Sequence, residues 1–294
     1  LLGTYIPDTM RRFHVAVASD NDRPYVMEKV TVTPLGEDEF APALREAVRR
    51  FAMPTRMSSI VMYQRLADAV SAAGVHGVLM GGGADEVCWG YPRHLDFLAT
   101  DFSGGPHMLS CAYFGDVAGK AAQLLSPAAA RRLTDRVDAL CDLALEDGFE
   151  AAVRRFEIDY SLEPLLRRAD HLLMGSTIEA RLPFLHNGLP AFGRALGRGN
   201  LEGGRQKAAL LALGQLRLPY YPLDRRKRHF RVPFDRWPRV VAKMRDLVAA
   251  GQDVLAALGL IPPGDDALAT MDVSLLFTLT TAVLWWESHG DRIE

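Results

Sequence analysis

The sequence has few cysteines and no long apolar run. Its three cysteines, Cys88, Cys111 and Cys141, lie far apart and form no CxxC pair. This spacing argues against a disulfide framework or a structural zinc site and favours a reducing, cytoplasmic location. The most apolar stretch, Leu275–Trp286, has 12 residues, fewer than the ~20 that a membrane span needs. We therefore expect a buried helix there and no membrane partner.

The sequence also lacks an excess of charge of either sign. Its 34 basic and 36 acidic residues give a formal net charge of −2, whereas general binding to nucleic acid or to an anionic membrane needs an excess of positive charge. Lysine is scarce, and only five of the basic residues are lysines. The 294 residues, 49% of them hydrophobic, suffice for an ample core. We expect a globular protein that does not bind nucleic acid.

Strand and helix patterns alternate over the first hundred residues. Phe13–Ser19, Val30–Thr33 and His76–Met80 are short, apolar and partly β-branched, as buried strands are. Between the second and the third, Glu37–Phe51 and Ser58–Ala73 have the spacing of amphipathic helices. This alternation predicts an α/β fold with a mainly parallel sheet.

After about residue 100 the sequence predicts helices and no further strand. The predicted helices are Ala118–Leu125, Pro127–Leu145, Pro164–Thr177, Arg205–Gly214 and Asp235–Ala250. We expect one domain over residues 1–294, in which residues 1–100 form an α/β nucleotide-binding part and residues 101–294 a mostly helical part.

Three glycines, Gly81 to Gly83, follow the third predicted strand and precede Asp85 and Glu86. Ligands of open α/β sheets bind at the carboxyl ends of the strands. Glycines let a ligand approach the backbone closely, and the N–H groups at a helix start favour an anion. Asp85 and Glu86 would offer oxygen ligands to Mg²⁺. The alternative is a plain strand-to-helix turn whose two acids suit the start of a helix.

Two later segments carry clusters of charge. Glu179 and Arg181 stand where a helix passes into an extended segment before Pro183, and we interpret them as a buried ion pair that braces the fold. The basic segment at residues 224–231 (DRRKRHFR) is either a solvated loop or a patch for phosphate groups. The balanced net charge favours a small phosphorylated ligand over a polymer.

Four segments, taken in order, resemble the asparagine synthetase family. Residues 78–92 (VLMGGGADEVCWGYP) resemble its S-G-E-G-A-D-E-x-F-G-G-Y-P segment, and residues 170–185 resemble its D-R-x-S-M-A-x-S-x-E-A-R-x-P-F-L-D signature. Residues 207–233 resemble its run of K-x-x-L, L-P and R-x-K-x-G-F-x-x-P motifs. Residues 58–63 (SSIVMY) are similar to the S-A-I-P-L-Y start of a helix upstream. The chain is identified as a member of this family on these four segments.

The resemblance implies an adenine-nucleotide α-hydrolase-like, ATP pyrophosphatase type of fold. In this family ATP adenylates a carboxylate with release of pyrophosphate, and an amine then attacks the acyl-adenylate to give an amide and AMP. The cofactors implied are ATP and Mg²⁺. Carried over by position, Asp85 would hold Mg²⁺ and Lys227 would neutralise negative charge on the reacting oxygens. ATP would lie against Val15, Met80, Gly81, Gly82 and Gly83.

One departure from the family pattern lies in the glycine turn itself. Asparagine synthetases have an acidic residue between the two glycines, and Gly82 stands there in this chain. Relatives that close rings, such as β-lactam synthetases, also lack that acid and deprotonate an internal amine with another residue. Glu157, which precedes the helix of Asp170, is the candidate for a replacement base. The alternative is that Glu157 is an ordinary surface residue.

The second departure lies at the front of the chain. The family's S-G-G-x-D-S pyrophosphate loop is expected one helix before the Phe13 strand, but only 12 residues precede Phe13. The stretch from Asp20 to Val30 is short for a helical crossover between parallel strands. The family's N-terminal glutaminase domain is also absent from the sequence. We expect either a degenerate member or a longer chain from which segments are omitted.

These patterns lead to three functional hypotheses. The first is an AMP-forming amide ligase of the asparagine synthetase kind. The second is a ring-closing relative such as a β-lactam synthetase or a lasso-peptide cyclase, and the third is a non-catalytic binding or scaffold member. The expected partners are a small-molecule or peptide carboxylate, an amine, and a separate glutaminase or peptide-substrate protein.

Overall fold

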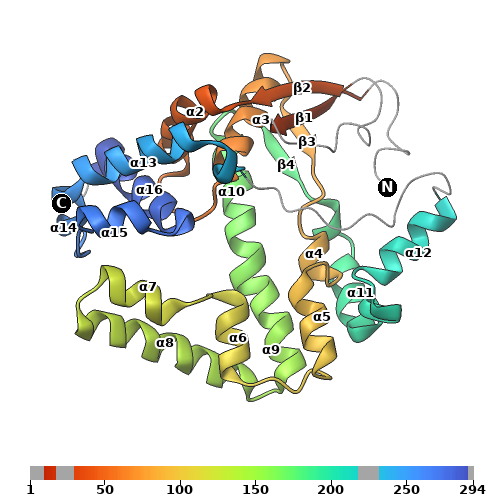
Figure 1. Ribbon diagram of the computed structural model, residues 1–294. Helices are drawn as coiled ribbons and strands as arrows, with labels where there is room; N and C mark the ends of the chain where they lie inside the picture. The colour runs from red at the N-terminus through yellow and green to blue at the C-terminus, as the bar shows by residue number, and fades with distance from the viewer. Residues whose placement is uncertain (1–9, 18–29, 218–231, 291–294) are drawn as a thin grey trace.

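The computed structural model describes residues 10–17, 30–217 and 232–290. Within these residues four short strands lie at one end of the molecule and helices make up most of the rest (Figure 1). The strands are β1 (Arg12–Val17), β2 (Val30–Leu35), β3 (Gly77–Leu79) and β4 (Glu179–Arg181). The combination of parallel strand pairs with many helices is consistent with the α/β class.

The α-helices are named in chain order. They are α2 (Glu37–Phe51), α3 (Ile60–Ala72), α4 (Ala84–Val87), α5 (Pro92–Ala99), α6 (Pro106–Tyr113), α7 (Val117–Leu124), α8 (Pro127–Leu145), α9 (Phe149–Phe156), α10 (Glu163–Met174), α11 (Leu189–Leu196), α12 (Ala208–Arg217), α13 (Pro238–Ala250), α14 (Gln252–Ala257), α15 (Asp265–Thr270) and α16 (Val273–His289). The other helical turns are the π-helix η2 (Glu157–Leu162) and the 3₁₀ turns η3 (Pro183–Leu185), η4 (Gly197–Gly204) and η5 (Phe234–Arg236).

Both strand pairs are parallel. β1 pairs with β2 from Arg12 opposite Val30 to Val17 opposite Leu35. β3 pairs with β4, which comes about a hundred residues later in the chain, so that Val78 lies opposite Ala180. The prediction that strands end after residue 100 was therefore wrong. The three residues of β4 are too few to show a strand period, and only their tertiary pairing with β3 defines them as a strand.

Several predicted elements are confirmed. Helices α2 and α8 have the predicted bounds, and strands β1 and β3 lie within or close to the predicted segments. Acidic residues fill the first turn of α2 and arginines its last turn, an order that favours the helix dipole. Strand β2 runs through Pro34 to Leu35, beyond the predicted end at Thr33.

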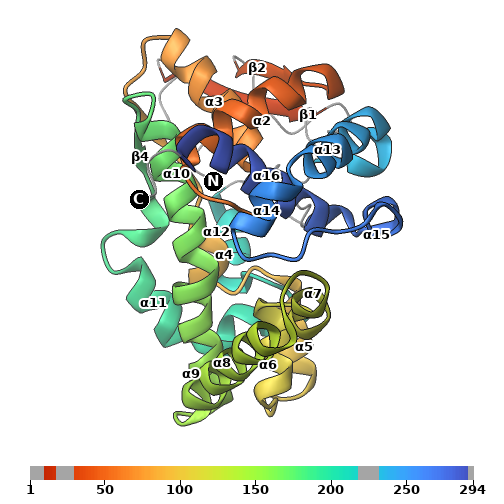
Figure 2. The same cartoon turned by 90° about the vertical axis from the view of Figure 1, so that its left-hand side faces the viewer.

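Apolar side chains from both ends of the chain share one cluster. Buried residues of β1, α2 and α3 pack against those of α13 and α16, with Phe40, Phe51 and Phe277 among the largest. Both views place α13 and α16 beside α2 (Figures 1 and 2). The apolar stretch predicted to be a buried helix lies in α16, which contributes Leu276, Leu279 and Leu284 to this cluster. Among the described helices none has the length and apolar character needed to cross a membrane.

A second cluster lies at the other end of the molecule. It joins α5, α6, α8 and α9 around Phe97, Leu109 and Phe156. Helix α9, the π-helix η2 and α10 follow one another without a break and form a rod between the two ends (Figure 1). Within this rod the Glu163 N–H bonds to the carbonyl of Ile158, five residues back, which widens the helix there. Because α10 ends beside β4, the rod links the helical end of the molecule to the strands.

Candidate functional site

The glycine turn lies where β3 ends and α4 begins. Gly83 precedes α4 with φ of 87°, a left-handed conformation that favours glycine. A side chain on Gly82 would come within 2.6 Å of Leu182 Cδ2, and one on Gly83 within 2.5 Å of Leu185 Cδ2. At Gly81 an added Cβ meets no atom within 4 Å. The segment around β4 and η3 thus covers two of the glycines, and the backbone at Gly81 stays open to a ligand.

Asp85, in the first turn of α4, forms an ion pair with Lys207. Lys207 Nζ lies 2.8 Å from Asp85 Oδ1, and the two side chains are 28% and 26% exposed. Gly90 makes room for the pair, because a Cβ there would lie 1.9 Å from Asp85 Oδ1 and 2.3 Å from Lys207 Cε. The turn therefore has a carboxylate and a cation side by side, and both remain within reach of solvent.

Glu86 does not face this site. Its side chain is buried and accepts a hydrogen bond from the Tyr91 hydroxyl. Burial raises the pKa of Glu86, against the opposing effect of the Tyr91 hydrogen bond. The expectation that Asp85 and Glu86 together ligate Mg²⁺ is therefore wrong for Glu86, since successive residues of a helix point in different directions.

The two other nucleotide-binding candidates lie on the strands. Met80 directly follows β3, is half-buried, and donates its N–H to the carbonyl of Arg181 over 2.9 Å. Val15 lies in the middle of β1 and is buried in the core. Phe13, two residues before Val15 on the same strand, packs against the apolar cluster that Met80 also contacts. Lys227, the predicted charge-neutralising residue, lies outside the described residues.

Glu157 is buried in the helical half of the molecule. Its side chain is 1% exposed, so the alternative that it is a surface residue was wrong. Arg93 donates two bonds to its carboxylate, from Nε over 2.8 Å and from Nη2 over 2.7 Å. The Tyr113 hydroxyl donates a third bond over 2.7 Å, and His94 Nε2 a fourth over 2.7 Å. We refer to Glu157, Arg93, His94 and Tyr113 as the Glu157 cluster.

The hydrogen bonds fix the charges within the Glu157 cluster. His94 Nδ1 accepts the Tyr91 N–H over 3.2 Å, which leaves the ring proton on Nε2 and makes His94 a neutral donor to Glu157. Burial alone would raise the pKa of Glu157, but the bonds from His94 and Arg93 outweigh burial and lower it. The cluster is therefore a Glu157–Arg93 ion pair with two neutral donors.

Glu179 and Arg181 form the predicted ion pair, but on the surface. Their nitrogen and oxygen atoms are 3.2 Å apart, and the side chains are 57% and 64% exposed. Both residues lie on β4, where alternate side chains share one face of the strand. The expectation of a buried brace was wrong because a three-residue edge strand leaves that face to solvent.

Over the described part of the chain, no group of three or more His, Cys, Asp and Glu side chains is arranged to hold a metal ion. Mg²⁺ is commonly held by one or two carboxylates together with water and substrate phosphates. A partly exposed Asp85 beside open glycine backbone fits that mode of binding, in which phosphate oxygens complete the metal's ligands.

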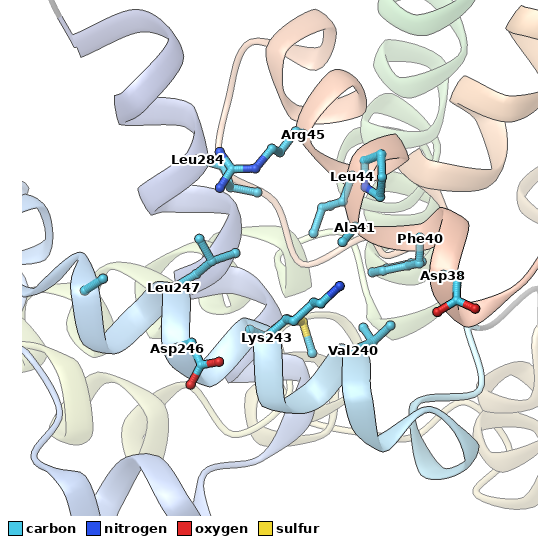
Figure 3. Close-up of a pocket in the computed structure, with 13 residues that line it drawn as sticks. Asp38, Phe40, Ala41, Leu44, Arg45, Val240, Lys243, Asp246, Leu247 and Leu284 are labelled. Atoms are coloured by element: carbon cyan, nitrogen blue, oxygen red, sulfur yellow. The ribbon is translucent and has the colours of Figure 1, made fainter.

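A separate cavity of about 580 Å³ lies between α2, α13 and α16. Its walls are mostly apolar, and Lys243 extends into it from α13 (Figure 3). It shares no lining residue with the glycine turn. The candidate site is therefore the turn and its Asp85–Lys207 pair rather than this cavity.

The structure adds residues that the sequence analysis did not assign. Lys207 carried a signal, since it is one of five lysines and falls on a family motif. Gly90 and Tyr91 lie in the glycine segment, but nothing in the sequence predicted that one accommodates the ion pair and the other bonds Glu86. Arg93, His94 and Tyr113 had no signal, because they converge on Glu157 from 44 to 64 residues away in the chain.

A glycine-rich turn at the end of a parallel strand, opening a helix with a carboxylate, is typical of nucleotide-binding α/β proteins. The comparison with family models gives a more specific assignment. The asparagine synthase model matches residues 9–259, so the chain belongs to the asparagine synthase family, whose members are ligase-type, ATP-dependent enzymes that form amide bonds. The comparison with curated proteins finds no match.

Proposed function

We propose that this protein is an ATP- and Mg²⁺-dependent synthetase with an ATP pyrophosphatase type of fold. A carboxylate oxygen of the substrate attacks the α-phosphorus of ATP, and pyrophosphate leaves. An amine then attacks the acyl carbon of the adenylate, AMP leaves with the bonding electrons, and the amine proton passes to a base. The product is an amide. The observation that carries this proposal is the Asp85–Lys207 pair at the glycine turn of a family member.

Each residue of the turn has a role that suits its chemistry. The open backbone at Gly81 and the N–H groups that follow it suit the phosphates. Asp85 would hold Mg²⁺, which supplies positive charge to the phosphate oxygens when bound. Lys207, which pairs with Asp85 in this structure, would offer a second cation to the phosphate groups. Val15 and Met80 border the nucleotide, and Lys227 neutralises the reacting oxygens, as the family resemblance implies.

A ring-closing reaction, in which carboxylate and amine belong to one substrate, is the second candidate function. The observation that favours it is the packing at Gly82, where Leu182 occupies the space that an acidic side chain would need. A synthetase without that acid needs another base for the amine. The substrate is then a small molecule or peptide with both groups. Transfer of ammonia from a separate glutaminase belongs to the first candidate, and a cytoplasmic location suits both.

Pyrophosphate release tests the proposal. The protein is mixed with ATP, Mg²⁺ and a panel of carboxylates, with and without added amines, and pyrophosphate and AMP are measured. We expect both products in equal amounts with at least one substrate. Calorimetry that detects no ATP binding in the presence of Mg²⁺ would instead support a non-catalytic scaffold.

Two lysine variants test the assigned role of Lys227. Lys227→Ala should lower turnover by about 10²-fold or more, the usual effect of removing one charge-stabilising group. Lys243→Ala, which removes an exposed lysine from the separate cavity, is the matched control and should leave turnover unchanged. Equal turnover in the two variants would show that Lys227 has no such role.

A further inference from the structure

We infer that Glu157 is a positioning residue whose buried ion pair holds helix α4, and with it Asp85, in place for Mg²⁺ and nucleotide. This inference rests on the proposed function, because it concerns the same site. It replaces the hypothesis that Glu157 is the base of the reaction with a role exerted through Arg93, His94 and the packing of the π-helix.

Burial, together with the bonds already made by Glu157, keeps its carboxylate from taking a proton from substrate. Its Oε1 accepts from Arg93, His94 and Tyr113, and its Oε2 from Arg93. A carboxylate has about four lone-pair directions, two on each oxygen, so Oε1 has none left and only Oε2 keeps one. A general base must lie within hydrogen-bond reach of the proton that it removes. A carboxylate that is 1% exposed and already accepts four hydrogen bonds does not meet this condition.

A continuous chain of contacts runs from Glu157 to the turn that bears Asp85. His94 bonds Glu157 with one ring nitrogen and the backbone of Tyr91 with the other. The Tyr91 hydroxyl bonds Glu86, the residue after Asp85. The Arg93 guanidinium lies over the Tyr91 ring, 4.0 Å from its centre. This cation–π contact helps to hold the ring in place.

The π-helix contributes to the same placement. η2 packs directly against α4, and Glu157 is the first residue of η2. Arg93 also bonds Ser161 of η2 over 2.8 Å, so α5 and the π-helix are fixed to each other. A π-turn inside a long helix often marks a functional position. Here it brings the buried carboxylate against the helix that carries the candidate metal ligand.

The tolerance for movement at Asp85 is small. The carboxylate of Asp85 fits against Gly90 with no space for even a methyl group, and Lys207 pairs with its Oδ1. A small shift of α4 would therefore change the distance between Asp85 and a metal–phosphate complex. Residues that orient a metal ligand from behind commonly change metal affinity about 10–100-fold when altered.

The test compares Glu157→Gln and Tyr91→Phe with the control Tyr160→Phe. Tyr160 lies in the same π-helix, partly buried, and its hydroxyl makes no hydrogen bond to the described residues. Calorimetry measures ATP binding over a series of Mg²⁺ concentrations, and pyrophosphate release is measured in parallel. We expect both test variants to need about tenfold more Mg²⁺ for half-saturation, with near-normal turnover once Mg²⁺ is saturating, whereas the control matches the unmodified protein.

Other outcomes separate the possibilities. An unchanged Mg²⁺ requirement in a folded Glu157→Gln and in Tyr91→Phe overturns the positioning role. A loss of turnover of about 10²-fold or more that Mg²⁺ does not restore would identify Glu157 as the base. If Glu157→Gln does not fold, Tyr91→Phe alone decides, since it removes one hydroxyl. If the unmodified protein binds no ATP with Mg²⁺, the proposed function fails and the inference fails with it.

Discussion

Lys207 Nζ lies 2.8 Å from Asp85 Oδ1, in space that exists because residue 90 is a glycine. The backbone of Lys207 has φ of 55°, a left-handed conformation that costs a residue with a side chain about 1–2 kcal/mol. Helix α12 begins at the next residue, and the Leu211 N–H bonds to the Lys207 carbonyl over 2.9 Å. The start of α12 and the strained backbone thus together direct Lys207 toward the glycine turn.

Gly90→Ala should disrupt this pair. The new methyl group would lie 1.9 Å from Asp85 Oδ1 and 2.3 Å from Lys207 Cε, so both side chains must move. We expect the free energy of unfolding to fall by about 1–3 kcal/mol, together with a loss of ATP-dependent activity. Gly105→Ala is the control, because its Cβ would meet no atom within 4 Å and its φ is −114°. Full activity in Gly90→Ala would contradict the importance of the pair.

The Asp85–Lys207 pair should matter more for activity than for stability. Because both side chains are about one quarter exposed, their ion pair should contribute at most about 1 kcal/mol to folding. A double-mutant cycle with Asp85→Asn and Lys207→Met, measured by urea unfolding, should give a coupling energy within that limit. Asp85→Asn should still abolish Mg²⁺-dependent pyrophosphate release. A coupling energy above about 3 kcal/mol would point to a structural brace instead.

Stability should depend on pH through Glu157. Its pKa in the folded protein is lowered from 4.5, so the ionised carboxylate stabilises the fold at every pH above the unfolded value. That contribution is lost as the pH falls below about 4.5 and through the folded pKa. At pH 7, Glu157→Gln should cost about 3–5 kcal/mol, because Arg93 loses its buried partner.

Thermal melts of the unmodified protein and of Glu157→Gln check this at several pH values. The difference in Tm between the two proteins should shrink as the pH falls below about 4.5. Only the unmodified protein has an ionised Glu157 whose stabilising charge is lost on protonation. Exposed Glu202→Gln serves as the control and should follow the unmodified protein. A difference that stays constant down to the acid unfolding region would contradict the ionised state of Glu157.

Restoring the family's acid at position 82 should need a second change. Gly82→Glu would bring its Cβ within 2.6 Å of Leu182 Cδ2, at a cost of about 1–3 kcal/mol. Adding Leu182→Ala removes the obstructing carbons, so the double variant should be more stable than the two single effects predict. If the missing acid limits the use of ammonia, amide formation from ammonia should rise in the double variant only. Purely additive Tm changes would show that the two side chains do not meet.

Local patterns in the sequence predicted much of the fold. Helix α2 has acids at its start, arginines at its end and apolar residues at helical spacing, and its bounds were predicted correctly. The glycine turn was recognised because three glycines follow an apolar strand and precede Asp85. Such signals lie within one turn or one strand, where neighbouring residues determine the conformation. The motifs that define the family are of the same local kind.

What failed depended on distant partners. Glu179 and Arg181 formed an ion pair as predicted, but their exposure follows from the pairing of β4 with β3. Nothing in the sequence around Glu157 indicated that its side chain is buried. Its neighbours along the chain, Phe156 and Ile158, would be the same whether the carboxylate faced solvent or the core. The three residues that bond it come from α5 and α6, and they meet only when those helices pack against the π-helix.

The sequence by itself determined the family, the position of the glycine turn and Asp85 as the candidate metal ligand. Only the tertiary structure decided that Glu86 faces inward to Tyr91, that Lys207 lies on Asp85, and that Glu157 is enclosed by Arg93 and His94. The physical reason is that a motif fixes the order of side chains along the chain. The charge and accessibility of each side chain are set by groups that packing brings to it from elsewhere.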